Sequence, residues 1–314
     1  MNPAEMRVVF MGSPEFAVPS LEALVEARYD VVLAVTQPDR PAGRGGRLRP
    51  SAVKVAAIQR GIPVFQPASL RDDETVARLA ETRADVFVVA AYGKILPRRV
   101  IDLPARGVLN VHSSLLPRWR GPSPVAAAIL AGDTETGVTI MEIAPKMDAG
   151  PIVAQRATPI GPGETAGELE VRLARLGADL LIEVLPGWYD RSIVPTPQDD
   201  VRATYCPLLR KEDGHLRRDM TATEAERAVR AYNPWPGAFV LYAGDRLGIW
   251  RARCLHDGEA DPGATRILDR RPAVAFVGGW LVLDEVQRPG SRRMAGDAFL
   301  NGLRGGLEPS VGLA

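Results

Sequence analysis

Short apolar runs alternate with helix-like stretches through the first 190 residues of this chain. We expect strands at 7–11, 31–35, 63–65, 85–91, 107–112 and 137–143, and helices at 15–27, 51–60, 73–82, 125–131 and 164–189. This alternation is typical of βαβ units, in which helices cover a mostly parallel sheet. The sequence therefore predicts a doubly wound, Rossmann-like α/β domain. Ligands of such domains bind beyond the carboxyl ends of the strands.

The pattern changes after a proline-containing stretch at residues 192–207. Beyond it, short apolar runs are separated by Gly, Asp and Pro, which favours a smaller antiparallel β-barrel of the OB type. We therefore expect a catalytic domain at 1–191, a linker at 192–207 and a second domain at 208–314. Thr221 or Thr223 is a candidate N-cap for a helix near the start of the second domain.

Composition narrows the class of protein. The chain has 314 residues, 46% of them hydrophobic, and a net charge of only +1, so no overall field marks it as a nucleic-acid binder. No apolar run is long enough to span a membrane and no secretory leader is evident, so a cytoplasmic protein is expected. Cys206 and Cys254 have no metal-binding spacing, and no metal is expected.

Two polar side chains share one face of a strand that is otherwise apolar. In GVLNVH, residues 107–112, the alternation of a strand places Asn110 and His112 on the same side. An amide and an imidazole held side by side can donate hydrogen bonds to the oxyanion that forms when a nucleophile attacks a carbonyl. The structural alternative is a core histidine bonded to Asn110.

Asp148 follows the next predicted strand, in a loop that contains glycine. We expect this loop to lie at a carboxyl end as well, where the carboxylate could orient His112 and take a proton from an attacking amine. An ordinary turn residue is the alternative. The turn at 12–14 lacks the GxGxxG fingerprint, and there is no Ser-His-Asp elbow and no catalytic thiol near His112, so direct acyl transfer is favoured over hydride transfer or covalent catalysis.

Four arginines lie in a loop rich in Gly and Pro, at positions Arg40, Arg44, Arg47 and Arg49. A charged loop of this length between a strand and a helix is more often functional than idle, and its charge suits a polyanion such as RNA. A solvated loop without a ligand is the alternative.

Several stretches resemble the folate-dependent formyltransferases. The most specific are LNVHSSLLPRWRGPSP and AGDTETGVTIMEIAPKMDAGPI, and further similar segments occur in the same order along nearly the whole chain, including AAYGKILP, LLRKEDG and GDAFLNGLR. The chain departs from that family at Ser113 and at HLRRDM, residues 215–220. The second departure leaves the packing at the start of the second domain open.

The resemblance implies roles for particular residues. Asn110 and His112 would stabilise a tetrahedral oxyanion, while Asp148 would hold His112 and accept the amine proton. The folate-binding residues would be Val89, Ala91, Tyr92, Gly93, Ser114, Leu115, Leu116 and Pro117.

The resemblance also implies the substrates. The donor would be 10-formyltetrahydrofolate and the acceptor the α-amine of initiator methionyl-tRNA, with Arg44 and its neighbours on the acceptor stem. We expect a monomer. Two alternatives are a formyltransferase acting on a small amine, and a catalytically silent protein that binds tRNA or folate. The arginine loop and the second domain argue against the former, and the three polar residues against the latter.

Overall fold

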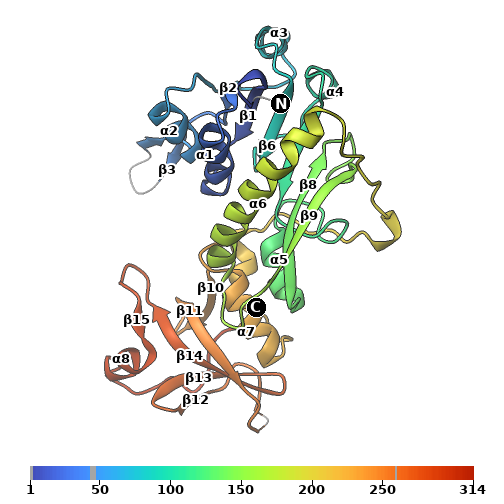
Figure 1. The fold of residues 1–314 in the computed structure, drawn as a ribbon. Coiled ribbons are helices and arrows are strands. Elements are labelled where there is room, and N and C mark those ends of the chain that lie inside the picture. Colours follow the sequence, from blue (N-terminus) through green and yellow to red (C-terminus); the bar gives the residue numbers. More distant parts are fainter. Residues whose placement is uncertain (1–2, 43–46, 259) are drawn as a thin grey trace. The chain divides into compact units, whose positions relative to one another are not determined.

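The computed structural model describes residues 3–42, 47–258 and 260–314. The chain divides into two compact units (Figure 1). Unit 1 comprises Met1–Pro124, Glu135–Pro159 and Glu170–Cys206, and unit 2 comprises Val125–Thr134, Ile160–Leu169 and Pro207–Ala314. Residues 192–206, which the sequence predicts to be a linker, belong to unit 1 in this division. None of the described helices is long and apolar enough to cross a bilayer.

Unit 1 is built on a seven-stranded sheet of order β5-β2-β1-β6-β7-β8-β9. The first five strands in this order are parallel, whereas β8 runs antiparallel to β7 and β9 antiparallel to β8. The predicted fold class, a mostly parallel α/β sheet, is confirmed. The strands are β1 (Arg7–Gly12), β2 (Asp30–Val35), β5 (Val64–Phe65), β6 (Val86–Ala90), β7 (Val108–His112), β8 (Glu135–Glu142) and β9 (Ile152–Pro159).

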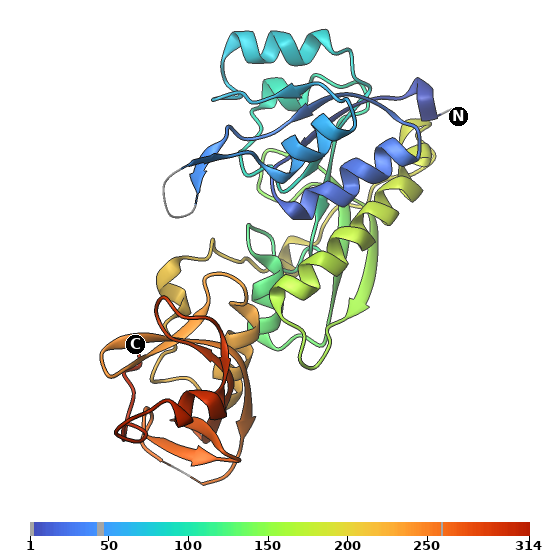
Figure 2. The ribbon, with the colours of Figure 1, turned by 90° about the vertical axis from the view of Figure 1, so that its left-hand side faces the viewer.

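Helices pack on this sheet because its central strands are apolar on both faces. All five residues of β6 are buried, as a strand covered on two sides requires. Helix α1 packs on α2, and α3 on α4, while α1 and α6 run side by side in both views (Figures 1 and 2). The helices are α1 (Val18–Glu26), α2 (Ala52–Gln59), α3 (Asp73–Glu81), α4 (Arg98–Ile101), α5 (Pro124–Ala131, mostly in unit 2) and α6 (Ala166–Tyr189).

Several elements of unit 1 were not predicted from the sequence, among them the four-residue helix α4. Strand β9 was missed because its burial alternates weakly, with half-buried residues on its inner side. The arginine loop forms a small hairpin of β3 (Arg40–Ala42) and β4 (Arg47–Arg49), in which Arg40 pairs with Arg49. Each strand of the hairpin has only three residues, too few for a periodic pattern to reveal it.

Unit 2 contains an antiparallel sheet of order β10-β11-β14-β13-β12, with β15 added to β14. Helix α7 begins after Thr221, whose hydroxyl accepts from the N–H of Glu224 while the Glu224 carboxylate accepts from Thr221, a capping box. The elements are α7 (Ala222–Ala231), β10 (Ala238–Tyr242), β11 (Asp245–Leu255), β12 (Thr265–Leu268), β13 (Arg271–Phe276), β14 (Gly279–Gln287), β15 (Met294–Ala295) and α8 (Gly296–Asn301).

The C-terminal segment pairs with both edges of this sheet. Gly312 exchanges two main-chain hydrogen bonds with Leu241 of edge strand β10, at 2.9 and 2.7 Å. At the opposite edge, Thr265 of β12 donates to the oxygen of Pro309 at 3.0 Å. One segment thus pairs with a residue of each edge strand, which reduces the number of unpaired groups at the sheet edges.

Candidate active site

The carboxyl ends of β1, β2, β6 and β7 meet at one edge of the unit 1 sheet, because these strands are parallel. Strand β7 ends at His112, whose side chain is 8% exposed. Asn110 lies two residues earlier and is partly exposed. Within the part of the chain that the structure describes, the Asn110 amide forms no hydrogen bond. Its N–H groups are therefore available to a ligand at this edge.

The imidazole of His112 is held through one nitrogen. Nε2 lies 3.0 Å from the main-chain oxygen of Trp119. Since a carbonyl oxygen only accepts, Nε2 carries the hydrogen of this bond. Nδ1 faces Oδ2 of Asp148 at 3.9 Å, within range of an ion pair when the imidazole is protonated but beyond a hydrogen bond. The alternative of a histidine bonded to Asn110 is not what the structure shows.

Asp148 lies beside His112, but the loop that carries it starts from a different edge of the sheet than predicted. Strand β8 runs antiparallel to β7, so its carboxyl end pairs with the beginning of β7, where Glu142 lies opposite Leu109. The expectation that Asp148 follows a neighbouring carboxyl end was therefore wrong. Instead the loop after β8 folds back along the sheet and returns Asp148 to the end of β7.

The Asp148 carboxylate is anchored on the loop that follows β7. Its Oδ2 accepts from the N–H of Gly121 at 2.8 Å, and the side chain is 18% exposed. The Asp148 main chain is in the left-handed region, at φ +48°, where non-glycine residues are uncommon and Asn, Asp and His are the ones most often found. Such a conformation persists only where surrounding contacts hold it. Here the backbone aims the carboxylate at His112.

The segment Ser114–Pro117, expected to bind folate, is tied to the neighbouring strands. The Ser114 hydroxyl donates to the oxygen of Arg118 at 2.7 Å, and the Thr139 hydroxyl donates to the oxygen of Ser114 at 2.6 Å. Leu116 donates its N–H to Thr139 at 3.1 Å, and its oxygen accepts from Gln155 at 2.8 Å. The loop is thus rigid, with Leu115 and Pro117 partly exposed and Leu116 buried.

The chain turns sharply after β6, at the second segment expected to contact folate. Ala91 and Gly93 have positive φ, at 46° and 77°, and both are exposed. Val89 is buried within the strand. Tyr92 points into the core, 1% exposed, and its hydroxyl has no hydrogen-bond partner among the described residues. Burial raises the pKa of Tyr92 to about 12. This turn offers a ligand main-chain atoms of Ala91 and Gly93 rather than the Tyr92 ring.

The arginine hairpin follows β2, whose carboxyl end lies at the same sheet edge. Arg40 is exposed and donates to the side-chain oxygen of Gln37, and Arg49 is exposed. Arg47 belongs to β4. Arg44 lies outside the described residues.

Two side chains that contact the catalytic loops, Arg120 and Gln198, were not predicted from the sequence. Arg120 is fully buried and bonds to Gln198 through Nε and Nη2. The two residues are 78 positions apart, so no local pattern joins them. The sequence feature that could have indicated Arg120 is its position, in a run of turn residues directly after the strand that carries Asn110 and His112.

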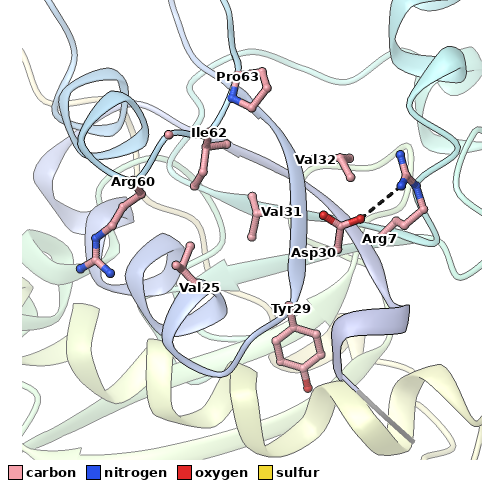
Figure 3. Close-up of a pocket in the computed structure, with 10 residues that line it drawn as sticks. Arg7, Val25, Tyr29, Asp30, Val31, Val32, Arg60, Ile62 and Pro63 are labelled. Atoms are coloured by element: carbon pink, nitrogen blue, oxygen red, sulfur yellow. Dashed lines mark hydrogen bonds and ion pairs between the residues drawn. The ribbon is translucent and has the colours of Figure 1, made fainter.

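A separate depression lies at the opposite, amino-terminal ends of β1 and β2 (Figure 3). Its volume is about 540 Å³, and Arg7, which starts β1, pairs with Asp30, which starts β2, at 3.2 Å. Arg60 at its rim pairs with Glu22 at 3.0 Å. The charged side chains of this depression are thus paired. The depression also lies at the opposite end of the strands from the carboxyl ends, where ligands bind in such sheets. Across the described residues, no group of three or more His, Cys, Asp or Glu side chains could hold a metal ion.

Family models match both halves of the chain. Residues 6–185 match the model described as formyl transferase, and residues 208–304 match the model of the formyl transferase C-terminal domain. Among curated proteins, the methionyl-tRNA formyltransferase of Thiobacillus denitrificans is 51% identical, over 95% of this chain and 96% of that protein. The methionyl-tRNA formyltransferase of Chloroflexus aurantiacus is 49% identical, over 95% of this chain and 97% of that protein.

Solved structures of more distant proteins have a similar fold. HypX from Aquifex aeolicus, solved with tetrahydrofolic acid, matches with a TM-score of 0.64 at 18% identity, over 95% of this chain and 47% of that one. An N-formyltransferase from Helicobacter canadensis, solved with folinic acid and dTDP-3-aminofucose, matches with a TM-score of 0.65 at 16% identity, over 90% of this chain and 99% of that one. At these identities the likeness concerns the fold.

Proposed function

This chain belongs to the formyl transferase family, and from that premise we propose that it transfers the formyl group of 10-formyltetrahydrofolate to the α-amine of initiator methionyl-tRNA. The observation that carries the chemistry is the convergence of Asn110, His112 and Asp148 at the end of β7. Relatives named methionyl-tRNA formyltransferase, identical at about half of all positions over nearly the full length, support the choice of acceptor.

The reaction begins with attack of the neutral α-amine on the formyl carbon. As the C–N bond forms, the carbonyl electron pair moves onto oxygen, and the resulting oxyanion needs donors already in place. Asn110 supplies a free amide N–H. His112, with Nε2 committed to Trp119, supplies Nδ1–H when its imidazole is protonated. Both donors act on charge that appears only in the transition state, so they accelerate the step rather than tighten ground-state binding.

Asp148 accounts for the proton that the amine must lose. Its Oδ2 is held by Gly121, and we assign Oδ1 to the amine proton. Collapse of the tetrahedral intermediate re-forms the carbonyl and breaks the bond to N10 of the folate. N10 takes up the proton that Asp148 accepted and leaves as tetrahydrofolate, which returns Asp148 to its carboxylate form. The carboxylate also lies 3.9 Å from Nδ1 of His112, where it helps to orient the imidazole.

The surrounding segments provide the substrate contacts in this proposal. The exposed turn at Ala91 and Gly93 and the rigid loop Ser114–Pro117 lie at adjacent strand ends, because β6 pairs with β7. A flat heterocycle fits such an apolar edge with free main-chain groups. Arg40, Arg44, Arg47 and Arg49 would bind phosphates of the acceptor stem. We expect the protein to act as a monomer in the cytoplasm, where charged initiator tRNA is found.

A formylation assay tests the proposal directly. Purified protein is incubated with 10-formyltetrahydrofolate and either initiator methionyl-tRNA, free methionine or a small amine, and the formylated product is measured. We expect product from methionyl-tRNA alone. Formylation of free amines at a comparable rate would contradict the proposed acceptor, and no product from any of them would contradict the proposed reaction.

Asp148→Asn is the informative variant in the same assay. Asparagine tolerates a positive φ and keeps an oxygen for the Gly121 N–H, so the fold is retained. It cannot take a proton, and loss of a general base costs roughly 10²- to 10⁴-fold in rate. A rate equal to that of the wild type would refute the role of Asp148 but leave the proposed function standing.

A further inference from the structure

The stretch from Thr196 to Cys206 lies against both loops that build the site. Thr196 exchanges two main-chain hydrogen bonds with Ile152, each 2.8 Å long, beside the Asp148 loop. Thr204 donates to the oxygen of Pro117 at 3.2 Å, and its own oxygen accepts from Arg120 at 2.9 Å, both in the loop after β7. This stretch therefore joins the two loops whose relative position sets the distance from Asp148 to His112.

The side-chain amide of Gln198 lies at the centre of this arrangement. Its nitrogen donates to the main-chain oxygens of Asp148 and Gly150, at 2.9 and 2.7 Å. Its oxygen accepts from Nε and Nη2 of Arg120, at 3.0 and 2.8 Å. Carbonyl oxygens only accept and a guanidinium only donates, so one orientation of the amide satisfies all four bonds. Both hydrogens and both lone pairs are used.

Arg120 fixes the orientation of that amide. The residue is 0% exposed, and a buried charge is retained only when it is paired and hydrogen-bonded. Nη1 completes its set by pairing with Asp200 at 2.7 Å and bonding to the Tyr205 hydroxyl at 3.2 Å. Arg120 therefore cannot rotate without losing its four contacts to Gln198, Asp200 and Tyr205, and Gln198 is held against the Asp148 loop.

The Asp148 backbone is the group that needs this support. At φ +48° Asp148 lies in the left-handed region, which non-glycine residues adopt uncommonly and which surrounding contacts have to maintain. Gln198 binds the carbonyl of this very residue and the carbonyl two positions on. If the loop relaxed, the carboxylate would move away from both Gly121 and His112.

We propose that Gln198, backed by Arg120, is a positioning residue for formyl transfer that holds the Asp148 backbone in its left-handed conformation and thereby places the carboxylate beside His112. The proposal rests on the function proposed above. Gln198 contacts no reacting atom in this scheme and acts only through Asp148. Its removal should therefore lower kcat while leaving the binding of folate and tRNA nearly intact.

The variant Gln198→Glu tests the two hydrogen bonds that Gln198 donates to Asp148 and Gly150. The glutamate keeps an oxygen for Arg120 but turns a carboxylate toward the oxygens of Asp148 and Gly150, which repels them. We expect kcat to fall roughly 10- to 100-fold, the effect of a misplacement of about 1 Å, with KM for both substrates within about twofold. Gln59→Glu, the same change on the exposed face of α2, is the matched control and should leave kcat unchanged.

A double-mutant cycle separates positioning from general damage to the fold. If Gln198 acts only through Asp148, then Gln198→Glu should cost less than about twofold in the Asp148→Ala background, because coupled residues are non-additive. The proposal would be overturned if Gln198→Glu lowered kcat in the Asp148→Ala background by as much as in the wild type. It would also be overturned if the single variant Gln198→Glu raised only KM or left kcat unchanged.

A measurement without substrates keeps this inference independent of the proposed function. The Gly121 amide proton, which is bonded to the Asp148 carboxylate, should resonate downfield in a ¹H–¹⁵N spectrum and move upfield in Asp148→Ala. Gln198→Glu should move it in the same direction, and Gln59→Glu should not. An unmoved Gly121 amide in Gln198→Glu would overturn the positioning role, even if the wild type formylates none of the acceptors tested.

Discussion

Nε2 of His112 lies 3.0 Å from the main-chain oxygen of Trp119, so the imidazole keeps a hydrogen on Nε2 and meets the substrate with Nδ1. This assignment distinguishes two substitutions. In His112→Asn the side-chain amide nitrogen occupies roughly the position of Nδ1, whereas in His112→Gln it reaches the position of Nε2. Removing an oxyanion donor costs roughly 10²- to 10³-fold in kcat. We expect His112→Asn to retain more kcat than His112→Gln.

The comparison requires that both variants be folded at the temperature of the assay. Thermal melting provides this check, since Gln keeps the bond to Trp119 and should be the more stable of the two. A higher kcat for His112→Gln would show that Nε2, and not Nδ1, serves the reaction.

Arg49 tests the role of the arginine hairpin. It is exposed and pairs with Arg40 across β3 and β4. If it contacts a phosphate, Arg49→Ala should raise KM for tRNA several-fold and reduce the salt dependence of log KM by about one unit of slope, while KM for folate stays the same. Arg60→Ala, at the opposite end of the strands, is the control. An equal rise in both KM values for Arg49→Ala would argue against a contact specific to RNA.

Gly121 tests how tightly the catalytic loop is packed. Its φ is +118°, and a Cβ added there would overlap the main-chain oxygen of Cys206. Strain and overpacking together predict that Gly121→Ala lowers the free energy of unfolding by about 3 kcal/mol. Gly61 has φ +69° but open space around it, so Gly61→Ala should cost about 1 kcal/mol. Urea titration measures both, and equal losses would mean that packing against Cys206 contributes nothing.

Asp200 predicts a pH dependence of stability. Hydrogen bonds from Lys146 and from Arg120 lower the pKa of its carboxyl below the ordinary 3.8. Because the carboxyl is more acidic in the folded state, its contribution is complete above the unfolded value and is lost as the pH falls through the lower folded value. The difference in Tm between wild type and Asp200→Asn should therefore be constant near neutral pH and shrink below about pH 4. A difference that grows on acidification would contradict the assigned ion pairs.

Asn110 and His112 were predictable because the signal was local. Two polar residues at a spacing of two in an apolar strand must share a face, and the parallel strands before them indicated which end of the sheet binds ligands. The fold class followed from the same alternation of runs.

The path of the chain from β8 to Asp148 was not predictable from such a local pattern. Apolar periodicity identifies a strand but carries no information on its direction, so the sequence did not indicate that β8 is antiparallel and ends at the opposite edge of the sheet. The contact between Gln198 and Arg120 depends on segments brought together only by the finished sheet, and each residue alone is of a type that usually lies on the surface.

The reversal of direction at β8 also limits how this region can change in length. Residues 143–147 have to carry the chain back along the sheet so that Asp148 meets His112, and Gly150 lies so close to the main chain of Glu142 that a Cβ would overlap its oxygen. Surface loops commonly absorb insertions at little cost. Here a single inserted or deleted residue would shift the carboxylate by the length of a peptide unit. The number of residues in this loop is therefore as much a requirement of the site as their identity.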